Sequence, residues 1–345
     1  MTPATAAALS IRHLSVRFPA PGGAVVAVDD VSFDVGPGET VGVVGESGCG
    51  KTVTALAVLG LLPTPPGEVT GGQVLVGGRD LLTIGARELR RLRGKEVAMV
   101  FQDPMTALHP AYPVLDQVVE AVWAHEPELG PVAARARAVE ALDLVGVPDA
   151  SRRARAYPHE WSGGMRQRAM IAMAVLHRPR VLIADEPTTA LDVTVQAQVL
   201  ELLRGIQREH HIAIVVISHD LGVIAEMADR VVVMYAGRIV EAAEVSELFA
   251  LPRHPYTAGL LASLPRLDVA RERLVPIVGS PPNLAAKPPG CAFHPRCPLR
   301  AGRHRCVDDV PELRPVDGAE RVTACHYAGE LAGSTRLEAE VDAPS

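Results

Sequence analysis

A short glycine-rich segment constrains the fold of this chain more than any other feature. Residues 45–52 read GESGCGKT and match the pattern G-x-x-x-x-G-K-[ST]. The preceding residues Glu39–Gly45 are rich in Val without polar alternation, which predicts a strand covered on both faces. Lys51–Leu62 is predicted to be a helix that stops before Pro63. The segment therefore predicts a phosphate-binding loop between a buried strand and a helix.

The residue types in this loop suit a nucleotide bound with Mg²⁺. Glycines allow successive backbone N–H groups to surround a phosphate closely. Lys51 is expected to place its charge between the β- and γ-phosphates, and Thr52 to offer its hydroxyl to Mg²⁺. Cys49 is interpreted as a small side chain tolerated beside the nucleotide, with a redox switch at its thiol as the alternative. The predicted nucleotide contacts are Gly45, Ser47, Gly48, Cys49, Gly50, Lys51, Thr52 and Val53.

An apolar run followed by two acids supplies the second element of the predicted site. Val181–Asp185 is typical of a buried strand whose last residue places a carboxylate at the carboxyl edge of the sheet, where ligands bind in such folds. Asp185 is expected to hold Mg²⁺ through water, and Glu186 to accept a proton from an attacking water. Taken in isolation, this run would be interpreted as an ordinary strand whose acidic end is exposed to solvent. Together with the phosphate loop, the run indicates nucleotide hydrolysis.

Strand-like and helix-like segments alternate over residues 9 to about 250. This predicts an α/β fold with a mainly parallel, doubly wound sheet and an antiparallel β subdomain. Residues about 103–178 carry almost only helical pattern and are expected to form a helical insertion within domain 1–250. A Pro- and Cys-rich extension is expected over 251–330, and a flexible tail over 331–345. The other predicted strands are Leu9–Phe18, Ala24–Val35, Gln73–Val76, Val97–Gln102 and Ile212–Ser218, and the other predicted helices are Val132–Val145, Arg166–Leu176 and Val193–Glu209.

Composition argues against several classes of protein. The 345 residues carry a formal net charge of −6 and 3% aromatics, so neither a basic face nor base-stacking platforms for nucleic acid are expected. No apolar run approaches the roughly 18–20 residues that span a bilayer. Met1–Ser10 has no secretory signal pattern. Any membrane role is therefore expected to come through a partner. The odd number of five Cys favours a reducing cytosol over a disulfide framework.

A second glycine-containing segment decides which family the sequence resembles. Residues 161–167 read WSGGMRQ, in which Ser162 is a good N-cap and the glycines leave backbone N–H groups open at the start of a long helix. The segment resembles the signature sequence of the ATP-binding-cassette (ABC) ATPases, with Trp161 in place of the usual Leu and Met165 in place of the usual Gln. In that family, the signature of one chain covers the nucleotide of its partner. The residues that this implies are Ser162, Gly163, Gly164 and Met165.

The resemblance covers about residues 9–245 and implies further roles. Phe18 stands where the family stacks an aromatic ring on adenine. Gln102 matches the Q-loop glutamine that senses Mg²⁺ and the attacking water. Asp192 matches the D-loop, which crosses to the partner site, and His219 matches the switch histidine that contacts the γ-phosphate. The implied catalytic residues are Glu186, His219 and Gln102, and the implied Mg²⁺ residues are Thr52, Gln102 and Asp185.

Three further segments narrow the resemblance to one group of ABC ATPases. FQDPMTAL at 101–108, HPYT at 254–257 and the C-terminal extension resemble the ATPases of dipeptide/oligopeptide (and nickel) importers, and the Met form of the signature resembles their D-type chain. This implies an ATP-hydrolysing subunit, with ATP and Mg²⁺ as cofactors, that energises peptide uptake. Nickel import and a non-transport ABC ATPase remain as alternatives.

The same resemblance implies the partners and the location of the chain. The expected partners are a second, non-identical ABC ATPase, two transmembrane permease subunits and, through these, an extracytoplasmic substrate-binding protein. No nucleic acid is expected among them. The chain is expected to lie peripherally at the cytoplasmic face of the cell membrane.

Four of the five cysteines lie close together in the extension. Their spacing, C-x5-C-x8-C-x18-C, is neither a common zinc pattern nor a common ferredoxin pattern. Some related peptide-importer ATPases hold a [4Fe–4S] cluster in this extension, so the resemblance implies an iron–sulfur cluster. Zinc and structural thiols are the alternatives. The residues concerned are Cys291, Cys297, Cys306 and Cys325.

Overall fold

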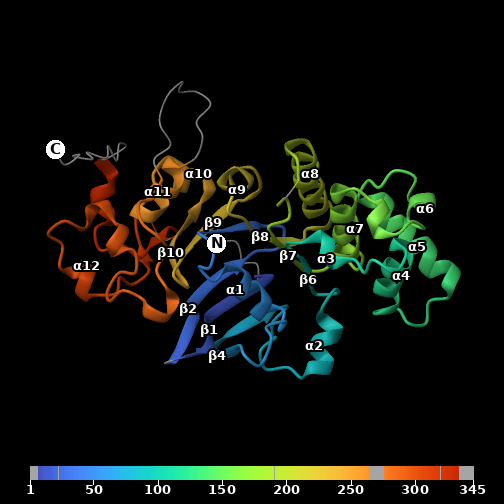
Figure 1. Ribbon diagram of the computed structural model, residues 1–345, viewed down its shortest axis with the longest axis horizontal. Helices are drawn as coiled ribbons and strands as arrows, with labels where there is room; N and C mark the ends of the chain where they lie inside the picture. The colour runs from blue at the N-terminus through green and yellow to red at the C-terminus, as the bar shows by residue number, and fades with distance from the viewer. Residues whose placement is uncertain (1–6, 22, 190, 264–275, 319, 334–345) are drawn as a thin grey trace, which may run out of the picture.

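A large sheet forms the centre of the molecule in the computed structural model, which describes residues 7–21, 23–189, 191–263, 276–318 and 320–333 (Figure 1). Its strands are β3 (Thr40–Val44), β6 (Val97–Val100), β7 (Val181–Asp185), β8 (Ala213–Ile217), β9 (Arg230–Tyr235), β10 (Arg238–Glu244), β11 (Arg314–Pro315) and β12 (Val322–Thr323). They lie in the order β11-β12-β10-β9-β3-β8-β7-β6. Neighbours from β9 to β6 pair in parallel, whereas β10, β12 and β11 pair antiparallel. The predicted mainly parallel sheet is confirmed.

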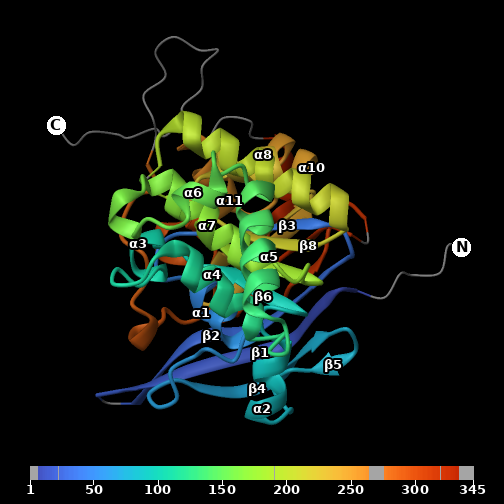
Figure 2. The same cartoon turned by 90° about the vertical axis from the view of Figure 1, so that its right-hand side faces the viewer.

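A smaller antiparallel sheet packs against one face of the large one. Its strands are β1 (Leu9–Ala20), β2 (Gly23–Val35), β4 (Glu68–Val76) and β5 (Arg79–Asp80), in the order β2-β1-β4-β5. In the side view it lies below the large sheet, with helix α1 (Lys51–Val58) above it (Figure 2). Helix α1 contacts β1 and β2 of the small sheet and β7 of the large one. The predicted antiparallel β subdomain is therefore present.

Helices occupy the other face and both ends of the large sheet. Helices α3 to α7 lie at the right-hand end in Figure 1, and the C-terminal extension lies at the left-hand end, so the parallel strands separate the two. Helices α8 and α9 lie above these strands in the same view. The bounds are α2 (Ala86–Leu92), α3 (Pro104–Ala107), α4 (Val114–Trp123), α5 (Pro131–Leu144), α6 (Ala150–Arg153), α7 (Gly163–Val175), α8 (Val193–His210), α9 (Leu221–Met227), α10 (Val245–Ala250), α11 (Pro255–Ala262) and α12 (Arg305–Asp308).

The large sheet is buried on both faces, which explains its unbroken apolar strands. On β7, Val181 and Ile183 belong to the core between the two sheets, whereas Leu182 and Ala184 belong to the core beneath the helices. Because successive side chains of a strand point to opposite faces, both sets must be apolar when both faces are covered. This is the reason that Val181–Asp185 shows no polar alternation.

Helix α1 is shorter than the sequence pattern predicts. The prediction extends to Leu62, but the helix ends at Val58 with Leu59 as its C-cap. Gly60 then takes a left-handed conformation with φ of +58°. The N–H groups of Gly60 and Leu61 donate hydrogen bonds to carbonyl oxygens of the last helical turns, at 3.0 and 2.8 Å. A glycine at this position terminates a helix readily because it lacks a Cβ, so the helix ends before Pro63 is reached.

The C-terminal extension is joined to the large sheet. Strand β12 pairs with β10, where Thr323 is the partner of Glu241. Tyr256 and Phe293 are almost completely buried and belong to the core beneath the helices. Residues 334–345 of the predicted flexible tail lie outside the described residues. None of the described helices is both long and apolar enough to cross a membrane.

A buried histidine at the base of the extension leads to a pH-dependence prediction. His254 is 1% exposed and accepts a hydrogen bond from the N–H of Tyr256 at 3.1 Å. Burial lowers the pKa of His254 to about 3, against an ordinary value of 6.5. Below pH 6.5 the unfolded chain binds a proton that the folded chain does not, so the free energy of unfolding should fall as pH falls. At pH 5 the expected loss is about 2 kcal/mol.

The measurement is chemical unfolding at pH 7.5, 6 and 5, with His254→Asn as the matched variant. Asparagine keeps a side-chain acceptor at the start of α11 but has no titrating group in this range. The variant should therefore lose less stability on acidification than the native chain. Equal pH slopes for the two proteins would contradict the assignment.

Candidate functional site

The loop between β3 and α1 requires glycine for geometric reasons. Gly45 and Gly50 have φ values of +153° and +107°. A Cβ on Gly45 would come within 2.3 Å of the carbonyl oxygen of Met234, and one on Gly50 within 2.5 Å of the carbonyl oxygen of Ala27. Both the backbone conformation and the close neighbours therefore exclude a side chain. The fold thus presses this loop between β2 and β9 at the start of α1.

Lys51 lies inside this loop. Its side chain is buried, and its ammonium donates hydrogen bonds to the carbonyl oxygens of Gly45 at 2.6 Å and Glu46 at 3.1 Å. Ser47, Gly48 and Thr52 are exposed on the open side of the loop, and Val53 is half-buried. The cationic residue is therefore held at the loop centre, as a phosphate site requires.

Cys49 has the properties of a packing residue. It is buried, and burial raises the pKa of its thiol despite the charge of Lys51 nearby. A protonated thiol is a poor nucleophile, so the geometry favours the small-side-chain interpretation over the redox switch.

Asp185 provides a donor set suited to Mg²⁺. It ends strand β7 with a side chain that is 2% exposed, and among the described residues its Oδ1 has no hydrogen-bond partner. Burial raises the pKa of this carboxyl group, while a hydrogen bond from Thr52 acts in the opposite direction. A buried carboxylate oxygen without a partner beside a threonine hydroxyl matches the oxygen ligands that Mg²⁺ prefers.

Glu186 is the centre of a polar cluster at the carboxyl edge of the sheet. Its Oε2 accepts hydrogen bonds from Nε2 of Gln102 at 2.8 Å and from the hydroxyl of Thr189 at 2.9 Å. Its Oε1 lies 3.1 Å from Nδ1 of His219. Burial acts to raise the pKa of Glu186, but the hydrogen bonds from Thr189 and His219 outweigh it, and the pKa is lowered. Glu186 is therefore ionised at neutral pH.

The backbone at Glu186 is also unusual. Its φ is +48°, a left-handed conformation that costs a non-glycine residue of order 1–3 kcal/mol and is typical of functional positions. The N–H of Glu186 donates to the carbonyl of Ile217 on β8 at 2.8 Å, which helps to hold this conformation. The ends of three strands, β6, β7 and β8, thus bring together Gln102, Glu186 and His219, the residues that the resemblance implies as catalytic.

Thr189 was not among the predicted site residues. Its hydroxyl contacts the same carboxylate oxygen as Gln102. The only signal for it in the sequence is its position three residues after Glu186, because a hydroxyl at that spacing can donate a hydrogen bond to the glutamate carboxylate.

The remaining predicted residues lie elsewhere. Ser162 caps helix α7 by accepting from the N–H of Met165 at 3.3 Å, and Ser162 and Gly163 are exposed. Across the described part of the chain, no hydrogen bond or ion pair joins this segment to the phosphate loop. Asp192 caps α8 by accepting from two backbone N–H groups at 3.1 and 3.0 Å. Phe18 is half-buried on β1 and packs against the core between the two sheets.

The prediction of an iron–sulfur cluster is wrong. Throughout the described ranges, which include all four cysteines of the extension, no group of three or more His, Cys, Asp or Glu side chains is placed to hold a metal ion. The same finding leaves the zinc alternative without support. All the cysteines are free, and Cys291 and Cys297 pack against the core beneath the helices. Burial raises the pKa of Cys291 to about 11 and that of Cys297 to about 12, so both remain neutral thiols that pack as small apolar groups.

Comparison with known proteins agrees with this geometry. Residues 28–189 match the ABC transporter family, and residues 240–306 match the C-terminal region of oligopeptide/dipeptide transporters. The chain is 52% identical to the dipeptide transport ATP-binding protein DppD of Bacillus subtilis over 85% of this chain and 87% of that protein. The chain belongs to the family of dipeptide and oligopeptide ABC transporter ATP-binding proteins. The predicted ATP-hydrolysing cassette and the predicted family are confirmed.

Two further relatives place this ABC ATPase in the same group and fold. It is 50% identical to the oligopeptide transport ATP-binding protein OppD of Salmonella typhimurium, over 84% of this chain and 86% of that protein. The dimeric structure of MJ0796, a bacterial ABC transporter cassette, matches 69% of this chain and 98% of the cassette, with a TM-score of 0.62 and 25% identity. The predicted fold class is therefore confirmed.

Proposed function

We propose that this ABC ATPase uses the cluster around Glu186 to hydrolyse ATP and so energises the uptake of di- or oligopeptides. The observation that carries the proposal is the convergence of Gln102, Glu186 and His219, beside a phosphate loop with a buried Lys51. The relatives named above are dipeptide and oligopeptide transport proteins, and the extension matches that group, which supports peptides as the substrate class.

The residues of the cluster divide the chemistry between them. Lys51 and the loop N–H groups bind the phosphates, and the ionised Glu186 accepts a proton from the attacking water at Oε1 or Oε2. Gln102 and Thr189 orient that carboxylate, and His219 lies exposed at the same edge, where it would contact the γ-phosphate of bound ATP. Asp185 and Thr52 would hold Mg²⁺, which neutralises charge on the phosphoryl oxygens.

The exposed signature segment explains why a second chain is part of the proposal. Ser162 and Gly163 lie exposed at the start of α7, and among the described residues no hydrogen bond ties them to their own phosphate loop, so they are available to a partner's nucleotide. Asp192, the N-cap of α8, is also exposed. We infer a heterodimer with a non-identical ABC ATPase, bound to two permease subunits at the cytoplasmic face of the membrane and served by an extracytoplasmic substrate-binding protein.

The test is reconstitution with purified components. The chain alone should hydrolyse ATP slowly, because the signature donors that complete its site belong to the partner. Adding the second ATPase chain, the permease in liposomes, the binding protein and a peptide should raise turnover at least about tenfold. Stimulation by nickel ions instead of peptides would contradict the substrate class. Full, peptide-responsive turnover by this chain as the sole ATPase would contradict the heterodimer.

A further inference from the structure

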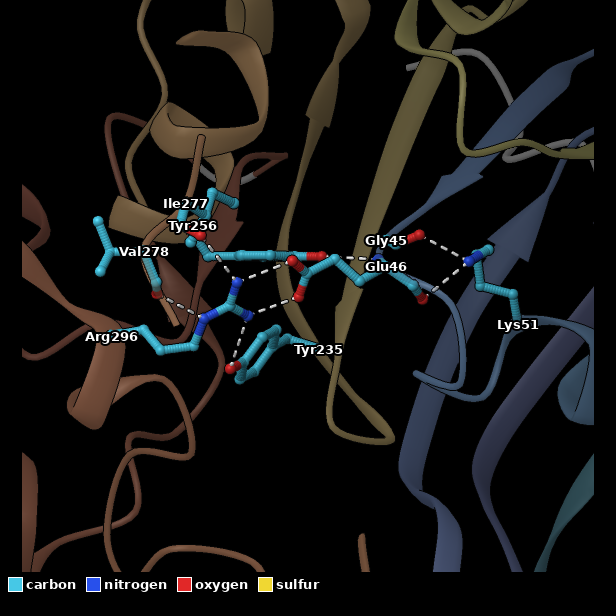
Figure 3. Close-up of polar contacts among 8 residues, drawn as sticks. All are labelled: Gly45, Glu46, Lys51, Tyr235, Tyr256, Ile277, Val278 and Arg296. Carbon is cyan, nitrogen blue, oxygen red and sulfur yellow. Dashed lines mark hydrogen bonds and ion pairs between the residues drawn. The ribbon is translucent and has the colours of Figure 1, made fainter. Parts of the chain in front are cut away.

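The C-terminal extension reaches the phosphate loop through one buried arginine. Arg296 is the last residue of a short 3-10 turn of the extension, and its side chain is 6% exposed. Its guanidinium forms a two-pronged ion pair with Glu46, the second residue of the loop: Nη1 lies 2.6 Å from Oε2 and Nη2 lies 2.9 Å from Oε1 (Figure 3). Such a paired geometry is stronger and more directional than a single charged contact.

The extension itself holds this guanidinium in place. Nε donates to the carbonyl of Val278 at 3.1 Å, and Nη2 approaches the carbonyl of Ile277 at 3.5 Å. Nη1 also lies 3.4 Å from the hydroxyl of Tyr235 on β9 (Figure 3). Every nitrogen of Arg296 therefore has a partner, and the fork points toward Glu46 before any nucleotide arrives. A guanidinium held in place in this way loses little conformational entropy when it pairs with Glu46.

Tyr256 contacts the same loop residue from helix α11. Its ring is completely buried, and its hydroxyl accepts a hydrogen bond from the N–H of Glu46 at 2.7 Å. Tyr256 packs on Tyr235 with ring centroids 4.6 Å apart and on Phe293 at 5.4 Å. The hydroxyl is thus fixed by an aromatic cluster that also includes part of the extension.

These contacts determine the orientation of one peptide unit. The N–H of Glu46 and the carbonyl of Gly45 belong to the same peptide plane and point in opposite directions. Tyr256 accepts from the N–H, while the carbonyl accepts from Lys51 at 2.6 Å (Figure 3). Gly45, with φ of +153° and no Cβ, offers little resistance to rotation of this plane. Tyr256 opposes this rotation on the N–H side and Lys51 on the carbonyl side, while Arg296 fixes the side chain of Glu46 that follows the plane.

We propose that Arg296 and Tyr256 are positioning residues that hold the first turn of the phosphate loop, and with it Lys51, in the conformation that binds nucleotide. The C-terminal extension then sets the nucleotide affinity of the ATPase. This inference rests on the proposed role of Lys51 and the loop in ATP binding. It assigns to the extension a function in nucleotide binding that is separate from its place in the sheet.

The test compares ADP binding by full-length variants, measured by titration calorimetry. Arg296→Gln and Tyr256→Phe should each raise the Kd for ADP about tenfold. Tyr256→Phe removes only a hydroxyl and keeps the aromatic packing, so it remains informative if Arg296→Gln folds poorly. Arg305→Gln is the matched control, because it removes an ion pair with Asp309 inside the extension without touching the loop. The control should bind ADP with the native Kd.

A double-mutant cycle and the kinetics separate positioning from general structural support. The variant with both Glu46→Gln and Arg296→Gln should bind ADP within twofold of the weaker single variant, because the two residues act as one contact. In the reconstituted transporter, Arg296→Gln should raise the KM for ATP and leave kcat at saturating ATP within about twofold. A lowered melting temperature with unchanged KM would overturn the inference.

Lys51→Ala distinguishes failure of the inference from failure of the proposed function. If Lys51→Ala abolishes ADP binding while Arg296→Gln and Tyr256→Phe bind within twofold of native, the positioning role is wrong and the nucleotide site stands. If Lys51→Ala binds ADP normally, the loop is not the nucleotide site and both proposals fail.

Discussion

A Glu186→Gln chain assembled with its partners is expected to bind ATP as tightly as the native chain and to hydrolyse it roughly 100- to 10,000-fold more slowly. The amide is nearly the same size and still accepts the hydrogen bonds from Gln102 and Thr189 through its oxygen. It does not accept the proton of the attacking water. The measurements are ATP affinity and single-turnover hydrolysis in the reconstituted transporter.

Two controls make this result specific. Thr189→Val removes one hydrogen bond to Glu186 and keeps the base, so its effect should be much smaller than that of Glu186→Gln. Lys51→Ala should lose ATP affinity itself, which distinguishes a binding defect from a chemical one. Hydrolysis at the native rate by Glu186→Gln would show that another group is the base.

The largest stability effect is expected at the buried ion pair between the extension and the large sheet. Glu241 on β10 is 0% exposed, and its Oε1 lies 2.9 Å from Nη2 of Arg321, which is also buried. The carboxylate accepts two more hydrogen bonds, from the N–H groups of Arg253 and His254 at 2.7 and 2.9 Å. Arg321→Met would leave this buried charge without its cation. The free energy of unfolding should fall by about 3–5 kcal/mol.

The comparison that tests this mechanism is a double variant. Glu241→Gln combined with Arg321→Met should lose less stability than Arg321→Met alone, because no uncompensated charge remains buried. Arg305→Gln removes an exposed ion pair and should change the free energy of unfolding by less than about 1 kcal/mol. Urea unfolding followed by circular dichroism measures all three. A loss below about 1 kcal/mol for Arg321→Met would contradict the prediction.

Elements with local signals could be predicted from the amino-acid sequence. The phosphate loop depends on glycines at fixed spacing and on Lys51 at the start of a helix, and these can be read without knowing the fold. The predicted strand Val181–Asp185 has the same bounds as β7, because a short run of apolar residues is typical of a strand that is buried on both faces. Glu186 and His219 follow such strands, so their meeting at one edge of a parallel sheet could also be predicted.

The state of the extension cysteines was decided by the tertiary structure. The spacing of Cys291, Cys297, Cys306 and Cys325 is compatible with ligands or with packed thiols. Whether sulfur atoms act as ligands depends on how they converge and on whether burial keeps them protonated, and neither is a local property. The described structure places no metal-holding group there, and burial raises the pKa of each of these thiols.

The tertiary structure alone also decided how the extension meets the active site. Arg296 and Glu46 are separated by 250 residues, and Tyr256 and Glu46 by 210, so no periodicity or spacing connects them. From the sequence alone, an arginine in a Pro-rich segment and a glutamate in a loop would each be predicted to be exposed to solvent. They pair because β12 and α11 bring the extension against the end of β9, beside the start of α1. Burial then turns a polar contact between distant segments into one that orients the phosphate loop.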